Sequence, residues 1–280
     1  MALKKLKPVT SSSRGVTLVD YKQLVTTKEP YKPLTIHLKS AAGRSGGKIT
    51  MHHKGGGVKR LYRIIDFARR IRDIEGTVKT IEYDPNRSCL ISLITYSNGL
   101  KSYIITPQDL KVGDKIIAGE NVPVEVGNAM PLSRIPVGTT IHNIEINPGS
   151  GGTLVRAAGT SAVVIGFSGN YAQVRMPSKE IRLINAKCYA TIGAVSNPDH
   201  KNVVKGSAGR NRRKGIRPTV RGMVKPPSAH PHGGGEAKGV IGHIPKDRWG
   251  NVRGKITRRK RHRYNHMRLV NRKGRKLLNS

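Results

Sequence analysis

Short apolar runs, separated by turn residues, fill the middle of this chain. From Gly76 to Thr106 such runs are interrupted at Asp84-Pro85-Asn86 and at Asn98-Gly99, which predicts antiparallel strands. The Asn-Gly pair favours a tight hairpin, because both residues tolerate positive φ. Between Gly138 and Val195, further β-branched runs alternate with Gly, Pro, Ser or Asn and predict a second group of strands.

These two groups, each of four to six short strands, predict two small β-barrels joined by the passage from Met130 to Gly138. Helix signals are scarce: residues 107–110 predict at most one turn, and residues 178–183 are too short and too β-branched for a helix. After His200 the apolar periodicity disappears, so this part cannot bury a core of its own. The predicted organisation is a basic N-terminal extension and lead-in over 1–70, one barrel over 71–130, a second over 131–200 and a basic Gly/Arg/Lys-rich C-terminal extension over 201–280.

Charge follows the same division. The 280 residues carry 52 Lys and Arg against 16 Asp and Glu, a formal net charge of +36. Residues 1–70 hold 16 basic and 3 acidic residues, 71–200 hold 12 and 11, and 201–280 hold 24 and 2. A near-neutral middle between strongly basic ends indicates extensions that repel themselves until a polyanion neutralises them, and we expect them to fold on binding.

Other classes of partner and compartment fit the sequence less well. A membrane also attracts cations, but there is neither a long apolar run nor a helix pattern that pairs a basic face with a broad apolar one. The basic start, MALKKLKP, is not followed by the apolar run of a secretory signal. Cys89 and Cys188 lie far apart without paired spacing, so we predict buried thiols in a reducing compartment rather than a disulfide or a zinc site.

The first basic stretch, Gly43 to Arg70, mixes glycines with cations. Glycine lets backbone N–H groups approach a phosphate closely, while the neighbouring side chains supply charge. Gly55 to Gly57 match no P-loop, because no Gly-Lys-Ser/Thr follows at the required distance; the alternative is a flexible linker. The predicted RNA contacts here are Arg44, Lys48, His52, His53, Lys54, Gly55, Gly56, Gly57, Lys59, Arg60, Arg63, Arg69 and Arg70.

Two further basic stretches lie toward the C-terminus. Gly206 to Arg221 uses Arg more than Lys, and a guanidinium group can bridge two phosphate oxygens or stack on a base; the alternative is a solvated surface run. Arg253 to Lys276 holds twelve basic residues and no acid, which predicts an RNA-binding tail or, as the alternative, a nuclear address. The predicted contacts are Arg210, Arg212, Arg213, Lys214, Arg217 and Arg221, followed by Arg258, Arg259, Lys260, Arg261 and Arg263.

His230 and His232 alternate ahead of three glycines. Zinc needs three or four ligands, and only Glu236 lies nearby. A catalytic histidine needs a nucleophile or an orienting carboxylate, and the residue before His230 is Ala229. We therefore predict a loop that fits a narrow groove, with imidazoles donating to phosphate or 2′-hydroxyl groups. Its predicted contacts are His230, His232, Gly233, Gly234 and Gly235.

Aromatic residues make up only 4% of the chain, and Trp249 is the sole tryptophan. This low content argues against a protein that stacks base after base of a single strand on its rings. It favours binding to a folded nucleic acid through shape and phosphate.

Six blocks occur in order over nearly the whole chain: GGGVKRLYRIIDF, EYDPNRS, GNAMPL, IPVGTTIHNIE, KGIRPTVRG and HPHGGGE. In this order they resemble the L-two family of large-subunit (50S) ribosomal proteins, in its bacterial or organellar form. The resemblance implies a mainly β fold, with an oligonucleotide-binding-type barrel followed by an SH3-like barrel. It also implies primary binding of ribosomal RNA, a role in subunit association through small-subunit RNA, support of tRNA binding near the peptidyl transferase centre, and neighbouring ribosomal proteins as partners.

In that family, a histidine corresponding to His230 has been proposed to assist peptide-bond formation. This sequence departs from the family there, because Asn-Pro-Val-Asp is replaced by Pro226, Pro227, Ser228 and Ala229. Without the aspartate, no carboxylate of that motif can orient His230. We expect a non-enzymatic scaffold; the alternatives are direct participation of His230 in peptidyl transfer and a histone-like DNA-packing protein, which would not explain the strand-rich middle. The nearby Ala237, in place of the common Gly, affects only the fine geometry of the loop.

The remaining expectations concern cofactors and location. Arg87 and Arg156, in the central part, complete the predicted RNA contacts. We expect no metal site, no cofactor and no membrane partner, with magnesium only as a counterion of the RNA. The predicted location is the ribosome in bacterial cytoplasm; the alternative is the mitochondrial matrix or the plastid stroma. The start of the chain, without an obvious transit extension, favours a bacterium or an organelle-encoded gene.

Overall fold

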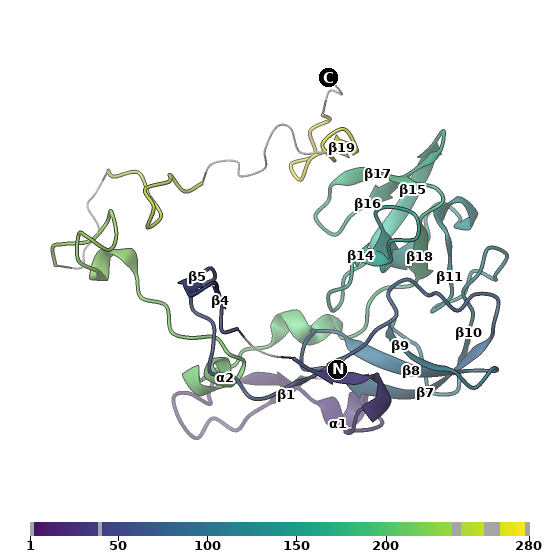
Figure 1. Cartoon of the computed structure of the whole chain (residues 1–280), viewed down its shortest axis with the longest axis horizontal. Helices are drawn as coiled ribbons and strands as arrows, with labels where there is room; N and C mark the ends of the chain where they lie inside the picture. Colours follow the sequence, from purple (N-terminus) through teal and green to yellow (C-terminus); the bar gives the residue numbers. More distant parts are fainter. Residues whose placement is uncertain (1–2, 39–40, 237–241, 255–263, 278–280) are drawn as a thin grey trace. The chain divides into compact units, whose positions relative to one another are not determined.

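The computed structural model describes residues 3–38, 41–236, 242–254 and 264–277, and they form a mainly β protein (Figure 1). Its contacts divide the chain into two units. The core unit comprises Met1–Lys39, Lys59–Ser207 and His266–Ser280, and the basic unit comprises Ser40–Val58 and Ala208–Asn265. Within the described ranges, no helix has the length and apolar character needed to cross a membrane.

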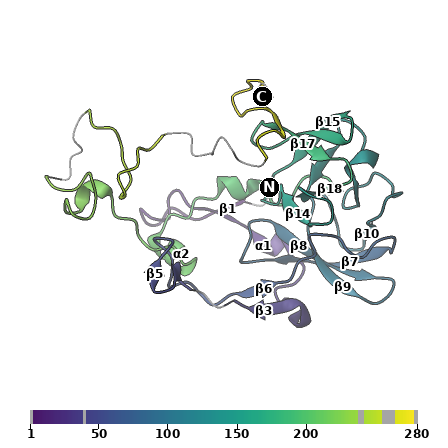
Figure 2. The ribbon, with the colours of Figure 1, turned by 45° about the horizontal axis from the view of Figure 1, so that its top comes forward.

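The first sheet of the core unit has four antiparallel strands in the order β10-β7-β8-β9 (Figure 1, Figure 2). Nearly all of β8 is buried, whereas β7 alternates over its first half between buried and exposed residues, as expected for a strand with one face toward a core. Tyr103 is fully buried and donates its hydroxyl to Glu82 Oε2 at 2.7 Å. The strands are β7 (Gly76–Tyr83), β8 (Leu90–Tyr96), β9 (Lys101–Ile105) and β10 (Lys115–Ile116).

The hairpin between β8 and β9 lies where the Asn-Gly pair predicts it. The turn differs from the expected one, because only Gly99 has positive φ, at 79°, and Asn98 does not. Tyr96 O accepts from Gly99 N, and Tyr96 N donates to Leu100 O, both at 2.9 Å. This is a three-residue loop with glycine in the left-handed region, so Asn98 instead contributes its side chain, which accepts from Leu100 N.

The second sheet has seven antiparallel strands in the order β11-β18-β12-β15-β16-β17-β19. Its inner face carries an aliphatic cluster in which Leu132, Ile141 and Ile144 are fully buried. A short pair, β13 (Ile144–Glu145) and β14 (Gly152–Leu154), accompanies the sheet. The seven strands are β11 (Ala129–Pro131), β12 (Thr140–His142), β15 (Ala162–Ser168), β16 (Tyr171–Arg175), β17 (Ile181–Asn185), β18 (Tyr189–Ile192) and β19 (Arg268–Val270).

The passage from Met130 to Gly138, which was predicted to join the two groups of strands, is part of the second core, because β11 and the 3₁₀ turn η2 (Leu132–Arg134) pack into it and Ile135 is only 1% exposed. One sequence prediction is wrong in this sheet. The C-terminal extension does not stay outside the fold along its whole length, because β19 pairs with β17. Glu180 fixes this contact: its largely buried carboxylate accepts from Arg268 Nη2 at 2.7 Å and from Arg182 Nη2 at 3.1 Å.

The two barrels are held together within the core unit. Gln108 N donates to Ala194 O at 2.7 Å, and Ser196 N donates to Thr106 O at 3.0 Å. Val195, between these two bonds, is fully buried in the apolar cluster under β8 and β9. A buried side chain flanked by backbone hydrogen bonds makes the connection part of the packed interior.

Part of the segment that precedes the first barrel, residues 1–70, is buried in the core unit. Ile65 is buried, and Tyr31 N donates to the Tyr103 hydroxyl at 2.7 Å. Residues 59–70 therefore belong to the core unit. The remaining elements of that unit are β1 (Leu3–Lys5), β2 (Thr17–Val19), α1 (Tyr21–Leu24), η1 (Lys32–Leu34), β3 (Thr35–His37), β6 (Leu61–Arg63) and η3 (Pro198–Asn202).

Both cysteines are free and buried, as predicted. Burial raises the pKa of Cys89 to about 11 and that of Cys188 to about 12. The thiols therefore stay protonated at neutral pH, and they behave as small apolar side chains.

His142 on β12 is a fully buried imidazole. Its Nδ1–H donates to Gly193 O at 2.8 Å, and its Nε2 has no hydrogen-bond partner among the described residues. The pKa of His142 is lowered from an ordinary value of 6.5 to about 4, mainly by burial and in smaller part by the charge of Arg69, although the hydrogen bond to Gly193 opposes the shift. The folded protein therefore resists protonation of a group that the unfolded chain protonates readily.

We predict that the free energy of unfolding falls by about 2 kcal/mol between pH 7 and pH 5 because of His142. The lowered pKa sets the sign, since stability is complete above pH 6.5 and is lost as the unfolded chain takes up the proton. Urea unfolding of the full chain at both pH values measures this change. His142→Asn should remove this part of the pH dependence, whereas exposed His37→Asn should not; equal slopes in wild type and His142→Asn would contradict the assignment.

Candidate nucleic-acid interface

An arginine cluster in the core unit brings together two predicted contacts, Arg87 and Arg156. Both guanidinium groups lie near the ring of Phe67, with the central carbon of Arg156 at 4.4 Å and that of Arg87 at 5.6 Å from the ring centroid. Arg87 also lies 5.7 Å from the ring of Tyr62. The arginine cluster, as we use the name, consists of Tyr62, Phe67, Arg87 and Arg156.

The EYDPNRS stretch explains how Arg87 is held. The side chain of Asp84 is completely buried, and its Oδ2 accepts from Arg87 Nε at 2.5 Å while its Oδ1 accepts from Asn86 N at 2.8 Å. Burial opposes the charge of Arg87, but the hydrogen bond and the negative charge of Asp84 outweigh it and raise the pKa of Arg87. Arg87 is therefore a fixed cation.

Arg156 is different because it is exposed. Its Nη1 donates to Gly152 O at 3.2 Å, and no carboxylate of the described residues forms an ion pair with it. Two guanidinium groups beside one aromatic ring, only one of them neutralised, create a local excess of positive charge. An anion at this surface would stabilise the cluster.

Arg63 and Arg69 do not lie on a surface. Arg63 is 7% and Arg69 is 3% exposed. Arg63 Nη1 donates to Leu61 O, and Arg69 Nη1 donates to Gly127 O in the loop between β10 and β11. Burial lowers the pKa of Arg69. Both residues were predicted as RNA contacts, and the structure instead makes them interior groups of the core unit.

The basic unit joins the first and second basic stretches, which are far apart in the sequence. Gly55 N donates to Gly215 O at 2.9 Å, Val58 N donates to Arg213 O at 3.0 Å, and Arg217 N donates to His53 O at 3.0 Å. The side chain of His53 continues this pairing, because its Nδ1 lies 2.9 Å from Pro218 O. The segment is therefore not a flexible linker, since backbone bonds anchor it to residues 213–218.

Glycine is required at this junction for close approach. A Cβ at position 57 would lie 2.9 Å from Gly215 N and 3.0 Å from Gly215 Cα. A Cβ at position 56 would lie 2.8 Å from Arg212 Nη2, and Arg212 Nη1 donates to Gly55 O at 3.3 Å. Gly57 brings two backbone segments together, and Gly56 leaves room for the guanidinium group of Arg212, whereas the sequence predicted that these glycines bring backbone to a phosphate.

Exposed cations surround this junction. The hairpin of β4 (Arg44–Ser45) and β5 (Lys48–Ile49) turns through Gly46 and Gly47, both with positive φ, as a two-residue hairpin requires. α2 (Ala208–Arg213) ends beside the junction. The predicted contacts that are exposed in this unit are Arg44, Lys48, His53, Lys54, Arg213, Lys214, Arg217 and Arg221, and those that are half-buried are His52, Arg210, Arg212, His230 and His232; in the core unit, Lys59, Arg60 and Arg70 are exposed.

The histidine loop follows the 3₁₀ turn η4 (Gly222–Val224). His230 Nδ1 accepts from His232 N at 3.0 Å, and the two imidazole rings lie 5.3 Å apart. A Cβ at position 222 would lie 2.4 Å from the His230 ring, so only glycine at this position leaves room for the imidazole. The three glycines fold the loop back on itself, because Gly233 N donates to His230 O and Gly234 N donates to Lys225 O.

These hydrogen bonds assign the protons of both imidazoles. Since Nδ1 of His230 accepts, neutral His230 carries its proton on Nε2. His232 Nε2 accepts from Lys246 N at 2.8 Å, so neutral His232 carries its proton on Nδ1. Loss of solvation, together with the positive charges of His232, Lys225 and Arg253, lowers the pKa of His230. Each ring therefore has one nitrogen that accepts within the protein and one N–H that can donate outward.

The described part of the loop offers neither a metal site nor a catalytic dyad. No cluster of three or more His, Cys, Asp and Glu occurs among the described residues. Asp247 acts on His230 only through its charge, and its carboxylate accepts from Trp249 and Asn251 instead. The donor arrangement suits phosphate or hydroxyl oxygens.

Sequence reasoning missed the aromatic members of these sites. Tyr62 and Phe67 were read only as parts of a basic stretch, and Arg248 and Trp249 were not among the predicted contacts. Arg248 Nη1 donates to His52 Nε2 at 2.8 Å and lies over the Trp249 ring. The turn signal Lys-Asp-Arg-Trp-Gly-Asn beside the sole tryptophan was the available clue. The predicted contacts Arg258, Arg259, Lys260, Arg261 and Arg263 lie outside the described residues.

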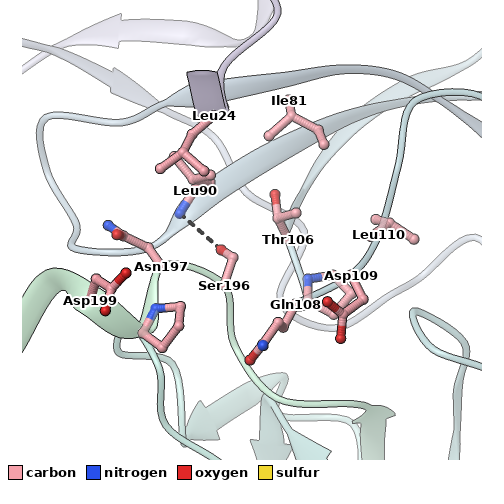
Figure 3. Close-up of a pocket in the computed structure, with 12 residues that line it drawn as sticks. Leu24, Ile81, Leu90, Thr106, Gln108, Asp109, Leu110, Ser196, Asn197 and Asp199 are labelled. Carbon is pink, nitrogen blue, oxygen red and sulfur yellow. Dashed lines mark hydrogen bonds between the residues drawn. The ribbon is translucent and has the colours of Figure 1, made fainter. Parts of the chain in front are cut away.

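A pocket of the core unit is apolar and acidic, unlike the basic sites described above (Figure 3). It has a volume of about 250 Å³, and its apolar wall includes Leu24, Ile81 and Leu110. Asp109 and Asp199 line it, and its lining includes no basic residue. This pocket does not suit a polyanion, so we do not include it in the interface.

Comparisons with known proteins show the family of the chain. The model of the family "Ribosomal Proteins L2, RNA binding N-terminal domain" matches residues 31–118, and the model "Ribosomal Proteins L2, C-terminal domain" matches residues 125–250. The chain belongs to the L2 family of ribosomal proteins. The expected order of an oligonucleotide-binding-type barrel and an SH3-like barrel is thereby confirmed, with the first sheet in the former match and most of the second sheet in the latter.

Individual L2 proteins are similar to the chain over most of its length. The "Large ribosomal subunit protein uL2" of Dinoroseobacter shibae is 52% identical over 262 residues, which cover 93% of each chain. The protein of the same name from Paracoccus denitrificans is 53% identical over 251 residues, covering 89% of this chain and 90% of that one. The arginine cluster lies partly in the match to the RNA-binding domain and partly in the match to the C-terminal domain.

We predict that Gly57→Ala loosens the junction between the two basic stretches. The added methyl group would meet the backbone of Gly215, and overpacking of this kind costs about 1 to 3 kcal/mol. Hydrogen exchange of the full chain should become about tenfold faster in peptides that cover residues 213–218. Gly209→Ala is the matched control, because nothing lies within 4 Å of its added Cβ; unchanged exchange in Gly57→Ala would contradict the described packing.

Proposed function

We propose that this L2 protein is a structural constituent of the large ribosomal subunit and binds ribosomal RNA through the arginine cluster and the basic unit. The observation that carries the proposal is the composition of the basic unit. It holds 20 basic and two acidic residues, and none of its described residues is buried. A folded segment without an apolar core needs a partner, and a polyanion supplies the missing stabilisation.

The chemistry of the exposed groups supports RNA as that polyanion. Arginines predominate around the glycine junction, and they can bridge phosphate oxygens with two parallel hydrogen bonds. The histidine loop adds imidazole N–H donors, which suit 2′-hydroxyl as well as phosphate oxygens. The names of the relatives, large ribosomal subunit proteins, agree with this assignment.

Finer roles, which the resemblance to the family implies, are part of the proposal. The protein supports association of the two subunits through contact with small-subunit RNA, and it supports tRNA binding and the peptidyl transferase centre. Neighbouring ribosomal proteins are further partners, and magnesium acts only as a counterion of the RNA. The ribosome of a bacterium is its location, since the relatives that we compared come from two bacteria.

His230 acts in this proposal as an RNA contact and not as a catalytic base. The lone pair of Nδ1 is occupied by the His232 N–H, and Nε2 carries the proton in the neutral ring. The lowered pKa makes the imidazole a weaker base, and Ala229 leaves no adjacent carboxylate to orient it. Each of these features opposes general-base catalysis, which needs an available lone pair near the reacting proton.

We predict that Arg156→Gln weakens binding of large-subunit ribosomal RNA and makes the fall of log affinity with log salt less steep. Each neutralised phosphate contributes roughly −0.7 to −0.9 to the slope, so the loss of one contact should bring the slope closer to zero by about that amount. Filter binding of the full chain at several salt concentrations measures it.

Arg134→Gln, at an exposed arginine outside the cluster, is the control for Arg156→Gln. Structured ribosomal RNA should also outcompete duplex DNA at equal salt. A salt-independent affinity, or stronger competition by DNA, would refute the proposed function.

We predict that ribosomes carrying His230→Ala form peptide bonds at saturating substrate within about twofold of the wild-type rate. Any defect should lie in assembly or in tRNA binding, because a lost donor weakens RNA contacts without removing a reacting group. Single-turnover peptidyl transfer with purified particles is the measurement. Fully assembled particles that bind tRNA but no longer form peptide bonds would support the catalytic alternative.

A further inference from the structure

The turn at Asp247–Asn251 holds a tryptophan outward from the basic unit. Asp247 Oδ1 accepts from Trp249 N at 2.9 Å and from Asn251 N at 2.8 Å, and Asp247 Oδ2 accepts from Asn251 Nδ2 at 3.0 Å. Asp247 N donates to Asn251 O at 2.9 Å and closes the turn. The hydrogen bond from the side chain of Asn251 is the largest cause that lowers the pKa of Asp247, so the carboxylate stays charged and keeps these bonds.

No contact among the described residues explains the exposure of Trp249. Its side chain is 69% exposed, compared with 42% for Phe167 and 39% for Tyr83. Tryptophan is usually well covered in folded proteins, because it carries the largest apolar surface of any side chain. A fixed turn that presents such a ring to solvent prepares a surface for a partner.

Two cationic or polar groups accompany the ring. The guanidinium carbon of Arg248 lies 5.2 Å from the Trp249 centroid, and the His52 ring lies 6.1 Å from it. Arg248 Nη1 donates to His52 Nε2 at 2.8 Å, which ties the turn to the first basic stretch. The tryptophan cluster, as we call His52, Arg248 and Trp249, therefore combines one flat apolar face with a fixed positive charge.

We infer that Trp249 is a stacking platform for a single unstacked base of the bound RNA, with Arg248 contacting an adjoining phosphate. The inference rests on the proposed RNA-binding function and adds a contact to a base. The cations and imidazoles of the basic unit, by contrast, are suited to phosphate and hydroxyl oxygens. Indole rings stack well on nucleobases, and arginine strengthens such sites through its charge. The charge of the basic unit, 20 basic against two acidic residues, favours RNA over an apolar partner.

The test uses the fact that Trp249 is the only tryptophan of the chain. Its fluorescence therefore reports on this ring alone in the intact protein. We would titrate the full chain with a single-stranded RNA of about ten nucleotides, a length that ordinary single-strand sites cover, and with an abasic strand of the same length and charge. The base-bearing strand should quench the emission and bind about fivefold to tenfold more tightly, and the abasic strand should bind without quenching.

Variants separate stacking from charge. In filter binding, which does not depend on tryptophan emission, Trp249→Ala should lose the preference for the base-bearing strand, and Trp249→Phe should retain part of it, because phenylalanine keeps an aromatic face. Ile244→Ala is the matched control, since Ile244 is a 61% exposed apolar residue of the same unit and is not aromatic. It should leave both affinities unchanged.

The outcomes distinguish the inference from the function on which it rests. Equal binding of both strands by wild type, with a salt-dependent affinity, would overturn the stacking platform and leave RNA binding intact. Failure of both strands and of ribosomal RNA to bind would remove the proposed function itself. A blue shift of the emission on phosphatidylserine vesicles, without a response to the base-bearing strand, would assign the ring to a membrane surface and would also overturn the inference.

Discussion

Repulsion among its cations is the constraint on which the structure of this protein depends. A chain with 52 basic and 16 acidic residues cannot neutralise itself by ion pairs. Two buried carboxylates of the core unit neutralise cations: Asp84 holds Arg87, and Glu180 holds Arg182 and Arg268. With these charges paired, the core unit can form around buried apolar side chains. The basic unit has no buried residue among those described and therefore lacks such a core.

The basic unit compensates for its lack of a core with backbone hydrogen bonds. Gly55, Val58 and Arg217 pair with partners across the junction, and glycine at position 57 permits the approach. Such bonds fix a local shape, but each contributes little net stability in water. The positive charge held on that shape remains uncompensated within the unit, which is why an anionic partner belongs to the physical description of an L2 protein.

Hydrogen bonds within the protein also decide what its histidines can do. His230 and His232 each use one ring nitrogen as an acceptor from a backbone N–H, so their remaining nitrogens are donors. The same principle applies to His52, whose Nε2 accepts from Arg248. Three imidazoles of the basic unit thus each have one ring nitrogen engaged as an acceptor, which leaves the other nitrogen to donate, an arrangement that suits oxygen atoms of RNA.

The sequence by itself determined the strand-rich middle, the two barrels and the separation of charge, because β-branched periodicity and local composition act over a few residues. It located the β8 to β9 hairpin through Asn98-Gly99, although not the form of the turn, which depends on which residue takes positive φ. It also identified most of the exposed cations of the candidate interface.

Only the tertiary structure decided which residues meet. Arg87 and Arg156 come to one Phe67 ring, Gly57 meets Gly215, and β19 joins a sheet whose other strands lie far earlier in the chain. It also removed Arg63 and Arg69 from the surface, although a basic stretch surrounds both in the sequence. The local sequence shows what each side chain could bind. Burial, close approach and hydrogen-bond partners depend on contacts between segments far apart in the chain, and a local pattern does not reveal these contacts.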